Sequence, residues 1–296
     1  MTIGVVTVTY NSGQVINAFL TSLLKQTYSA FTAYIVDNSS SDDTCKQIAS
    51  FEDARIQLIF NGNNLGIAEA NNQGIRQALN EGCELVLLIN NDTEFGPSLL
   101  EDLVRGLDEY SCDMVAPKIL SYHDRTIWSA GGGIDPRRAY SGFHYGYGQA
   151  DRGQFDTPRL VDHAPACCLL IRKEVFERIG MMDYRYFTYV EDTDFCYRAK
   201  RAGLKLMYLP AATLLHKAHS LTGGLASDFM MRYTTRNRVY FMLKHFGPWR
   251  GLYYIPAYQI HLFLQLVSTK AGMSRFWLRE KAFVEGLRLY RSSVNG

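Results

Sequence analysis

The stretch Leu85-Val86-Leu87-Leu88-Ile89, followed at once by Asn90-Asn91-Asp92, decides the fold class. Five consecutive apolar residues that end in turn formers are typical of a strand buried on both faces, as in a parallel sheet. Open α/β sheets bind ligands beyond the carboxyl ends of such strands, so Asp92 is a candidate ligand for a hard cation such as Mg²⁺ or Mn²⁺. Alternatively, residues 90–93 are an ordinary turn, with Thr93 or Ser98 as a cap for the next helix.

The same pattern precedes this stretch along the chain. Strands are predicted over residues 3–9, 32–37 and 56–60, and they alternate with helices over residues 14–26, 42–51 and 67–80. Strand and helix in this rhythm indicate an α/β fold, with a mixed, mostly parallel sheet flanked by helices and joined by right-handed crossovers. Further along, we expect strands over 166–171, 204–208 and 212–215, with a helix over 173–179.

Polar turns follow all four of the first strands. They contain Thr9 and Asn11 after the first strand, Asp37 after the second, and Asn64 and Gly66 after the third, besides residues 90–92. The carboxyl ends of parallel strands share one edge, so these turns predict a polar crevice of the kind that a nucleotide needs. The alternative is that all four are turns by chance. Neither a Gly-x-Gly-x-x-Gly nor a Gly-x-x-x-x-Gly-Lys-Ser/Thr motif occurs, which argues against a dinucleotide dehydrogenase and a P-loop NTPase.

Two later clusters have residues suited to catalysis or metal binding. Glu191-Asp192-Thr193-Asp194 fits the first turn of a helix, where acids are favoured by the helix dipole, and it equally fits a general base beside the crevice. A helix N-terminus lowers a carboxyl pKa, so such a base would be ionised. His216 and His219 follow an apolar strand, and imidazole binds ions of the Mn²⁺ type, although a histidine after a strand is often structural.

The segment between these clusters and the first strands is less regular. Residues 131–133 and 140–158 are predicted to be loops. They form either an ordinary surface connection or a mobile flap over a ligand.

Composition and charge divide the chain. It has 296 residues, of which 47% are hydrophobic, enough for one large domain with an appendage. Residues 1–223 hold 20 Lys/Arg against 26 Asp/Glu, a balance of −6, and residues 224–296 hold 11 against 3, a balance of +8. We therefore expect a domain over 1–223 and a basic helical segment over 224–296 that meets a membrane surface or another polyanion. The chain contains no recognised nucleic-acid-binding motif, so no nucleic-acid partner is expected.

The cysteines and the N-terminus bear on the cellular compartment. None of the six cysteines has Cys-x-x-Cys spacing, so they are expected to be small buried hydrophobic residues in a reducing compartment. The N-terminus lacks a basic stretch followed by an apolar one, so we expect no signal peptide and a cytoplasmic protein.

Residues 251–268 are apolar nearly all round, but they are short and interrupted for a transmembrane span. Basic residues flank them on both sides. This pattern predicts a helix that lies in the membrane interface. The alternative is a helical appendage or a homodimer contact that a second copy buries.

Several of these motifs occur in the order found in one known family. Val6-Thr7-Val8-Thr9-Tyr10-Asn11, Val36-Asp37-Asn38-Ser39-Ser40, Asn64-Leu65-Gly66, Asn90-Asn91-Asp92, Glu191-Asp192 and Arg236-Asn237 span about residues 3–245. In this set and order, the chain resembles the family 2 glycosyltransferases, which have a GT-A fold. It is most similar to their bacterial rhamnosyltransferase-type branch. The resemblance implies a nucleotide-binding half over about 1–93 and an acceptor half over about 94–223.

The resemblance implies roles for the residues of the first three turns. Asp37 matches the carboxylate that bonds the base of the donor nucleotide. Thr9 and Asn11 match the first loop, which contacts the nucleotide. Asn64 and Gly66 match the turn near the nucleotide.

The resemblance also implies a metal site and a catalytic base. Asp92 matches the last acid of the family's metal motif, whose first acid is replaced here by Asn90. His216 resembles the additional metal ligand, and His219 fits that place less well. Asp192 matches the catalytic base.

The implied activity is an inverting transfer of a sugar, with rhamnose as the leading expectation. The donor is a nucleotide-diphosphate sugar, used with Mg²⁺ or Mn²⁺, and the acceptor is a hydroxyl of a glycan or lipid-linked glycan in cell-surface polysaccharide synthesis, such as that of O-antigen. We expect this at the inner face of the plasma membrane.

Two other functions remain open from the sequence. A sugar-phosphate nucleotidyltransferase binds nucleotides on a similar sheet, but it usually has Arg and Lys in an early glycine-rich loop, and residues 10–24 contain neither Arg nor Lys. A catalytically inactive subunit that only binds the nucleotide sugar would explain Asn90 as the loss of a metal ligand.

Overall fold

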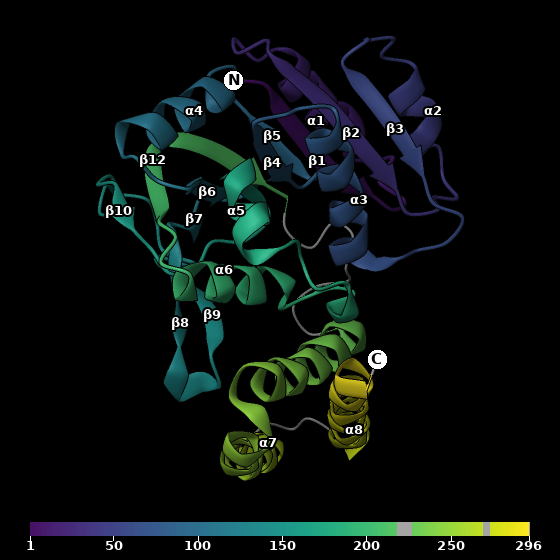
Figure 1. Cartoon of the computed structure of the whole chain (residues 1–296), viewed down its shortest axis with the longest axis vertical. Coiled ribbons are helices and arrows are strands. Elements are labelled where there is room, and N and C mark those ends of the chain that lie inside the picture. The colour runs from purple at the N-terminus through teal and green to yellow at the C-terminus, as the bar shows by residue number, and fades with distance from the viewer. Residues whose placement is uncertain (218–226, 269–272, 296) are drawn as a thin grey trace.

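A ten-stranded mixed β-sheet forms the body of the protein in the computed structural model, which describes residues 1–217, 227–268 and 273–295 (Figure 1). Its parallel half has the strand order β3-β2-β1-β4, made of β1 (Ile3–Thr9), β2 (Phe31–Asp37), β3 (Ile56–Phe60) and β4 (Leu85–Ile89). These bounds match the predicted strands to within one residue. The continuous apolar runs account for the match, since every side chain of β4 is buried.

The second half of the sheet contains antiparallel pairs. Strand β11 (Cys168–Arg172) runs antiparallel to β4 on one side and to β6 (Met114–Ser121) on the other. Strand β12 (Leu206–His216) is parallel to β6 and antiparallel to β5 (Thr93–Phe95) and to β10 (Arg159–Leu160). The carboxyl end of β12 therefore lies at the same edge as the carboxyl ends of β1, β2 and β4. Strand β7 (Ile127–Ser129) pairs with β6, and β8 (Gly132–Asp135) and β9 (Ser141–His144) form a separate two-stranded hairpin.

Helices cover both faces of the sheet. Ile3 and Val5 of β1 face a core shared with α1 (Ile16–Leu24), α2 (Thr44–Ala49) and α4 (Leu99–Glu109). Val6 faces the opposite core, shared with α3 (Gly66–Asn80), α5 (Lys173–Ile179) and α6 (Glu191–Arg201). Alternating side chains of one strand thus fill two cores, as expected of a sheet between two helical layers.

Several segments differ from the prediction. Residues 204–215 were predicted as two short strands, but β12 is one strand whose register shifts between Leu209 and Thr213. Pro210 lies at the shift, where its missing N–H interrupts the ladder without ending the strand. Residues 131–133 and 140–158 were predicted to be loops, but Gly132 begins β8 and Ser141–His144 form β9. A Cβ on Gly132 would lie 2.0 Å from the carbonyl oxygen of Phe143, so the close pairing with β9 depends on glycine.

The loop over residues 145–158 is fastened to the sheet. The buried Lys118 of β6 pairs with Asp151 at 2.9 Å and also pairs with Asp156. The Tyr208 hydroxyl donates to the carbonyl oxygen of Phe155 at 2.9 Å. These bonds favour a fixed surface connection over a mobile flap.

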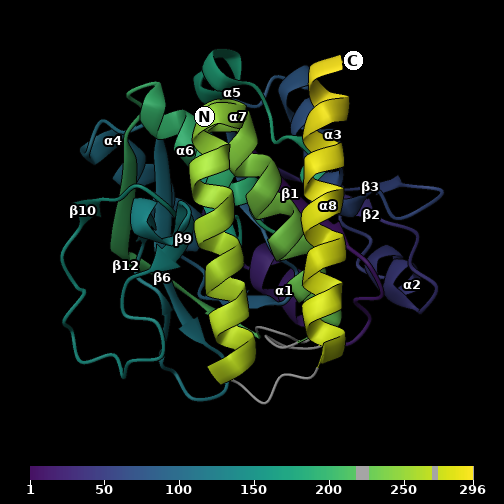
Figure 2. The ribbon, with the colours of Figure 1, turned by 90° about the horizontal axis from the view of Figure 1, so that it is seen from below.

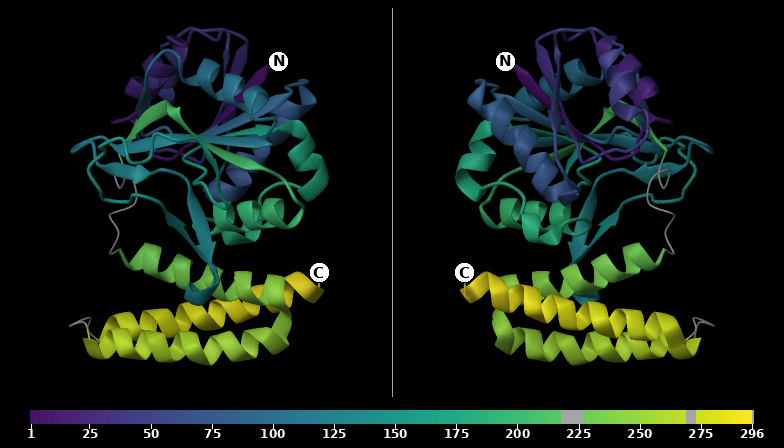
Figure 3. Two further views of the ribbon diagram at one scale, coloured as in Figure 1. Left: turned by 90° about the vertical axis from the view of Figure 1, so that its left-hand side faces the viewer. Right: turned by 90° about the vertical axis from the view of Figure 1, so that its right-hand side faces the viewer.

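The chain continues into two long helices, α7 (Asp228–Ser268) and α8 (Met273–Asn295). Gly247, with φ +73°, divides α7 into two segments. The second segment lies beside α8, and together they form a layer next to the sheet domain (Figures 2 and 3). Within the described residues, no helix has the length and apolar character required to cross a membrane.

Candidate active site

The polar turns that follow the parallel strands are bonded to one another. Asn91 Nδ2 donates to the carbonyl oxygen of Val8 at 2.8 Å and to Ser12 Oγ at 3.0 Å, which joins the fourth turn to the first. Asn38 Nδ2 donates to the carbonyl oxygen of Gly66 at 3.2 Å, which joins the second turn to the third. The structure therefore brings the four turns together at one edge.

Asp37 lies at the centre of the first two turns and is 2% exposed. Its Oδ1 accepts from the Thr9 hydroxyl at 2.8 Å, and its Oδ2 accepts from the Ser40 backbone N–H at 3.0 Å. Thr9 is fully buried, so its hydroxyl holds Asp37 in place. Asn11 is exposed, and its Oδ1 accepts from the Ser41 backbone N–H at 2.8 Å. Asn11 thus ties the first loop to the second at the surface.

The third turn meets a segment that lies far away in sequence. Asn64 Oδ1 accepts from the Gly66 backbone N–H at 2.9 Å. Gly66 has φ +83°, and a Cβ at this position would lie 2.5 Å from both the ring and the carbonyl oxygen of Phe187. The Ile67 N–H donates to the same carbonyl oxygen at 2.6 Å. The start of α3 therefore touches the segment that precedes Asp192.

Asp92 and His216 meet because β5 pairs with β12, where His216 lies opposite Thr93. Asp92 Oδ1 lies 3.2 Å from His216 Nε2, and both residues are buried. Burial lowers the pKa of the His216 imidazole, but Cys167 and the Asp92 carboxylate outweigh burial and raise that pKa to about 10. The two predicted metal ligands are thus adjacent, and His219 lies outside the described residues.

The Asp92–His216 pair offers one carboxylate and, once the His216 imidazolium has given up its proton, one imidazole nitrogen. Among the described residues, no group of three or more His, Cys, Asp or Glu side chains is placed to hold a metal ion. Mg²⁺ commonly binds through one or two carboxylates and completes its shell with substrate phosphates and water. The donor set therefore fits a divalent cation that shares its ligands with a diphosphate.

Glu191 and Asp192 begin α6 with opposite pKa shifts. Asp192 is about a quarter exposed at its side chain, and its Oδ1 accepts from the Thr193 N–H at 2.6 Å and lies 3.9 Å from His163 Nε2. Burial raises the pKa of Asp192, but His163, His144 and the Thr193 N–H together lower it. Burial and the charge of Asp192 raise the pKa of Glu191 to about 8. Asp192 is therefore the ionised carboxylate of the pair at neutral pH, and Glu191 is the neutral one.

The third acid of this cluster has a different role. Asp194 is fully buried, and its Oδ1 accepts from the Tyr186 hydroxyl at 3.0 Å and from Lys244 Nζ at 2.8 Å. Its Oδ2 accepts from Arg198 Nε at 2.8 Å. Lys244 lies on α7, as does His245, whose Nε2 is 2.7 Å from Asp194 Oδ1, so Asp194 fixes α6 to α7 and is structural.

A wall of rings joins the Asp92–His216 pair to Asp192. The ring centroids of His216 and Trp128 are 4.5 Å apart, those of Trp128 and His144 are 5.0 Å apart, and those of His144 and His163 are 5.4 Å apart. Local pattern did not single out Trp128, His144 and His163, because the three share no regular spacing and His144 lies in the stretch 140–158 that was predicted to be loop. The wall connects the predicted metal ligands to the predicted base, since its last ring, His163, lies 3.9 Å from Asp192 Oδ1.

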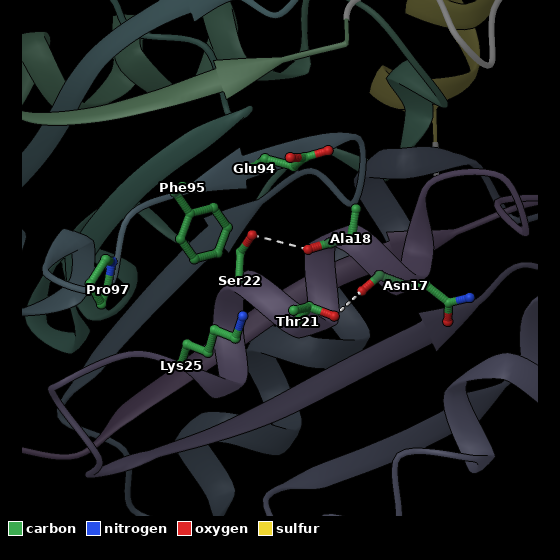
Figure 4. A pocket seen from close by; sticks show the side chains of 8 residues that line it. All are labelled: Asn17, Ala18, Thr21, Ser22, Lys25, Glu94, Phe95 and Pro97. Atoms are coloured by element: carbon green, nitrogen blue, oxygen red, sulfur yellow. Dashed lines mark hydrogen bonds between the residues drawn. The ribbon is translucent and has the colours of Figure 1, made fainter.

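A separate hollow lies between α1 and β5 with the residues that follow it (Figure 4). Its lining includes Asn17, Thr21, Ser22 and Glu94, and it includes none of the predicted site residues. The Thr21 and Ser22 hydroxyls donate to backbone carbonyls of their own helix. We therefore place the functional site at the four turns and not at this hollow.

Comparison with known proteins identifies the family. The sequence model of the family described as "Glycosyl transferase family 2" matches residues 4–180. The chain is 29% identical over 267 residues to an N-acetylglucosaminyl-diphospho-decaprenol L-rhamnosyltransferase of Mycobacterium tuberculosis, which covers 83% of this chain and 86% of that protein. It is 27% identical to the dTDP-rhamnosyl transferase RfbF of Shigella flexneri, over 71% of this chain and 67% of that protein.

Solved structures of distant sequence share the fold. The crystal structure of GalNAc-T7 with UDP, GalNAc and Mn²⁺ matches this chain with a TM-score of 0.64 at 16% identity. The match covers 82% of this chain and 48% of that one, so this chain spans about half of that protein. The mannosyltransferase PcManGT from Pyrobaculum calidifontis, in complex with GDP-Man and Mn²⁺, has a TM-score of 0.56 at 15% identity, over 99% of this chain and 86% of that one. The predicted GT-A fold is confirmed. The chain belongs to glycosyl transferase family 2, in its rhamnosyltransferase-like branch, and is an enzyme that moves a sugar from a nucleotide donor.

Proposed function

We propose that the chain transfers rhamnose, with inversion, from dTDP-L-rhamnose to a hydroxyl of a lipid-diphosphate-linked N-acetylglucosamine. The observation that supports this most is the ionised Asp192, set on the same wall of rings as the Asp92–His216 pair. An inverting transfer needs a base on one side of the anomeric carbon and stabilisation of a leaving diphosphate on the other. The names of the Mycobacterium and Shigella relatives support the choice of donor and acceptor.

The proposed reaction is one in-line displacement at the anomeric carbon. The acceptor oxygen forms its bond to that carbon as the bond from carbon to the diphosphate oxygen breaks. Asp192 takes the proton of the acceptor hydroxyl, and dTDP leaves with the electrons of the broken bond. Glu191, neutral and 8% exposed, does not compete for this proton at neutral pH.

The remaining site residues hold the donor. Asp37 receives the base of the nucleotide and is held for this by Thr9. Asn11, Asn64 and Gly66 shape the loops around the nucleotide. Asp92 and His216 would hold a divalent cation, Mg²⁺ or Mn²⁺, which when bound stabilises the charge on the departing diphosphate. Structural neighbours that contain Mn²⁺ with UDP or GDP-mannose support a cation of this kind.

We also propose that the basic segment 224–296 meets an anionic lipid surface at the inner face of the membrane, while residues 1–223 bind donor and acceptor. An exposed stripe of α8 contains Met273, Trp277, Lys281, Val284 and Arg288. Tryptophan favours the membrane interface, and Lys and Arg attract anionic lipids. Flotation with vesicles containing phosphatidylglycerol should retain the chain, and Trp277→Ser with Arg288→Ser should reduce retention. Equal flotation with neutral vesicles, or a dimer that hides this stripe, would count against the proposal.

The transfer is tested with purified chain, dTDP-L-rhamnose and N-acetylglucosaminyl-diphospho-polyprenol. We expect release of dTDP and a rhamnosylated lipid, both dependent on acceptor and on Mg²⁺ or Mn²⁺, and strongly reduced in Asp92→Asn. Release of pyrophosphate from a nucleoside triphosphate would instead indicate a nucleotidyltransferase. Donor binding without turnover on any acceptor would indicate an inactive subunit.

A further inference from the structure

We infer that Asn237, supported by Arg236, is a positioning residue for the proposed base: it holds residues 186–190 in the shape that presents Asp192. The inference rests on the proposed function only in naming Asp192 as the base. It assigns a catalytic consequence to the first segment of α7, which lies outside the matched residues 4–180.

The backbone before Asp192 has an unusual conformation. Phe187, Tyr189 and Val190 have φ values of +66°, +63° and +73°. These values fall in the left-handed region, which residues with a Cβ rarely adopt and β-branched residues such as valine adopt least. Such strain persists only where the surrounding structure fixes it, and it clusters at functional sites. Val190 directly precedes α6, so its conformation sets the direction in which Asp192 leaves the loop.

Asn237 supplies the bonds that fix this conformation. It is fully buried, and the two hydrogens of its Nδ2 are shared among the carbonyl oxygens of Tyr186, Thr188 and Tyr189, which lie 2.9, 2.6 and 2.7 Å away. These carbonyls are close in sequence, and they can point to one donor only because residues between and beside them, such as Phe187 and Tyr189, have positive φ. One amide thus gathers the carbonyls of the whole strained segment.

Arg236 orients this amide. Its Nε donates to Asn237 Oδ1 at 2.7 Å, which fixes which end of the amide faces the loop. Its Nη2 donates to the carbonyl oxygens of Arg185 at 3.0 Å and Tyr186 at 2.5 Å. Two adjacent side chains of α7 therefore bond four carbonyls between residues 185 and 189.

The clamped segment lies between the donor side and the C-terminal helices. On the donor side, the Phe187 carbonyl oxygen accepts from the Ile67 N–H at the start of α3. On the other side, the Phe187 ring stacks on Tyr233 of α7, with centroids 5.1 Å apart and planes 20° apart. In α8, a Cβ on Gly286 would lie 2.5 Å from the Arg236 carbonyl oxygen, so the two helices are in close contact there. Asn237 thus sets the base relative to the nucleotide loops.

A second buried amide provides a matched control. Asn72 Nδ2 donates to the Met182 carbonyl oxygen at 2.8 Å, and its Oδ1 accepts from the Met182 N–H at 3.0 Å. Like Asn237, Asn72 is a buried side chain on a helix, and it forms hydrogen bonds to the backbone of a neighbouring segment. It holds a residue outside the left-handed segment, so Asn72→Ala should cost stability without moving Asp192.

The test compares Asn237→Asp, Arg236→Lys and Asn72→Ala with the unmodified chain. Asn237→Asp keeps the size of the side chain and the acceptor for Arg236, but it turns carboxylate oxygens toward the carbonyls. We measure kcat and KM with dTDP-L-rhamnose and N-acetylglucosaminyl-diphospho-polyprenol, and hydrogen exchange of peptides that cover residues 186–192. Displacement of a catalytic group by about 1 Å costs about 100-fold in rate. We expect a loss of that order in kcat for Asn237→Asp, with donor KM changed less than about threefold and exchange raised locally.

If Asn237→Asp does not fold, Arg236→Lys still tests the inference. Arg236→Lys keeps the charge and loses the forked donors, so we expect a smaller loss of kcat, about tenfold, with the same local rise in exchange. Asn72→Ala should keep kcat. The inference is overturned if either α7 variant keeps full kcat, or if kcat falls only together with donor binding and global exchange, as for a structural residue. If the unmodified chain transfers no rhamnose, the proposed substrates are wrong, but hydrogen exchange of residues 186–192 still tests the inference. Unchanged exchange in both α7 variants overturns it, and a rise confined to residues 186–192 supports it.

Discussion

Replacing Gly66 with alanine should separate the cost of a left-handed backbone from the cost of moving the segment before Asp192. Gly66 has φ +83°, and an added Cβ would lie 2.5 Å from the ring and the carbonyl oxygen of Phe187. Gly82 has the same φ of +83°, but an added Cβ would meet nothing within 4 Å. Gly82→Ala therefore measures the conformational cost alone, about 1–2 kcal/mol. Gly66→Ala adds an overpacking cost of about 1–3 kcal/mol, for a total of about 2–5 kcal/mol.

The two variants should also differ in activity. Phe187 cannot retreat from the new methyl group without disturbing its bond to Ile67 and the strained backbone that leads to Asp192. We expect kcat to fall at least about tenfold in Gly66→Ala and to stay unchanged in Gly82→Ala. Urea unfolding gives the free energies, and initial rates of dTDP release give kcat. If Gly66→Ala matched Gly82→Ala in both measurements, the contact between α3 and the Phe187 segment would have no role in catalysis.

Two further substitutions test the charges of the site. In the folded chain the pKa of Glu191 is about 8, above the ordinary value of 4.5, so the unfolded chain loses this proton at lower pH and the free energy of unfolding should fall as pH rises from about 4.5 to 8. Glu191→Gln should remove that fall. If the difference in stability between Glu191→Gln and the unmodified chain did not change with pH, Glu191 would not be buried in its neutral state. Asp37→Asn keeps the shape of the side chain and removes its charge. The KM for the donor should therefore rise about 10- to 100-fold, as for the loss of a hydrogen bond to a charged group, with kcat little changed. A loss confined to kcat would show that Asp37 does not bind the nucleotide.

Local sequence pattern was enough to predict the parallel half of the sheet. Strands such as β4 are continuous apolar runs, and a parallel sheet places their carboxyl ends together without further information. Asp37 ends β2 and Asp92 lies three residues beyond β4, so their places at the edge could be predicted. The contact between Asp92 and His216 could be inferred only from resemblance, because it depends on the antiparallel pairing of β5 with β12 across more than a hundred residues.

The parts that the sequence did not predict depend on long-range contacts or hide their local signal. Strand β6 contains Pro117 and Lys118, which are unfavourable in a central strand, and it is accommodated by ion pairs from the loop that follows. The left-handed residues before Asp192 include no glycine, so nothing in their sequence marks the turn. The amide of Asn237 stabilises that turn from a distant helix, and only the folded chain shows the contact.

The central claim is that Asp192, and not its neighbour Glu191, is the base of the transfer. The measurement that tests it most directly is kcat for Asp192→Asn beside Glu191→Gln, with donor affinity measured in the same samples by calorimetry with dTDP. Loss of a general base typically costs about 10²- to 10⁴-fold, so we predict a fall of that size for Asp192→Asn, with dTDP affinity unchanged. Glu191→Gln mimics the neutral side chain and should keep kcat within about threefold. Full turnover in Asp192→Asn, or a larger loss in Glu191→Gln, would contradict the account.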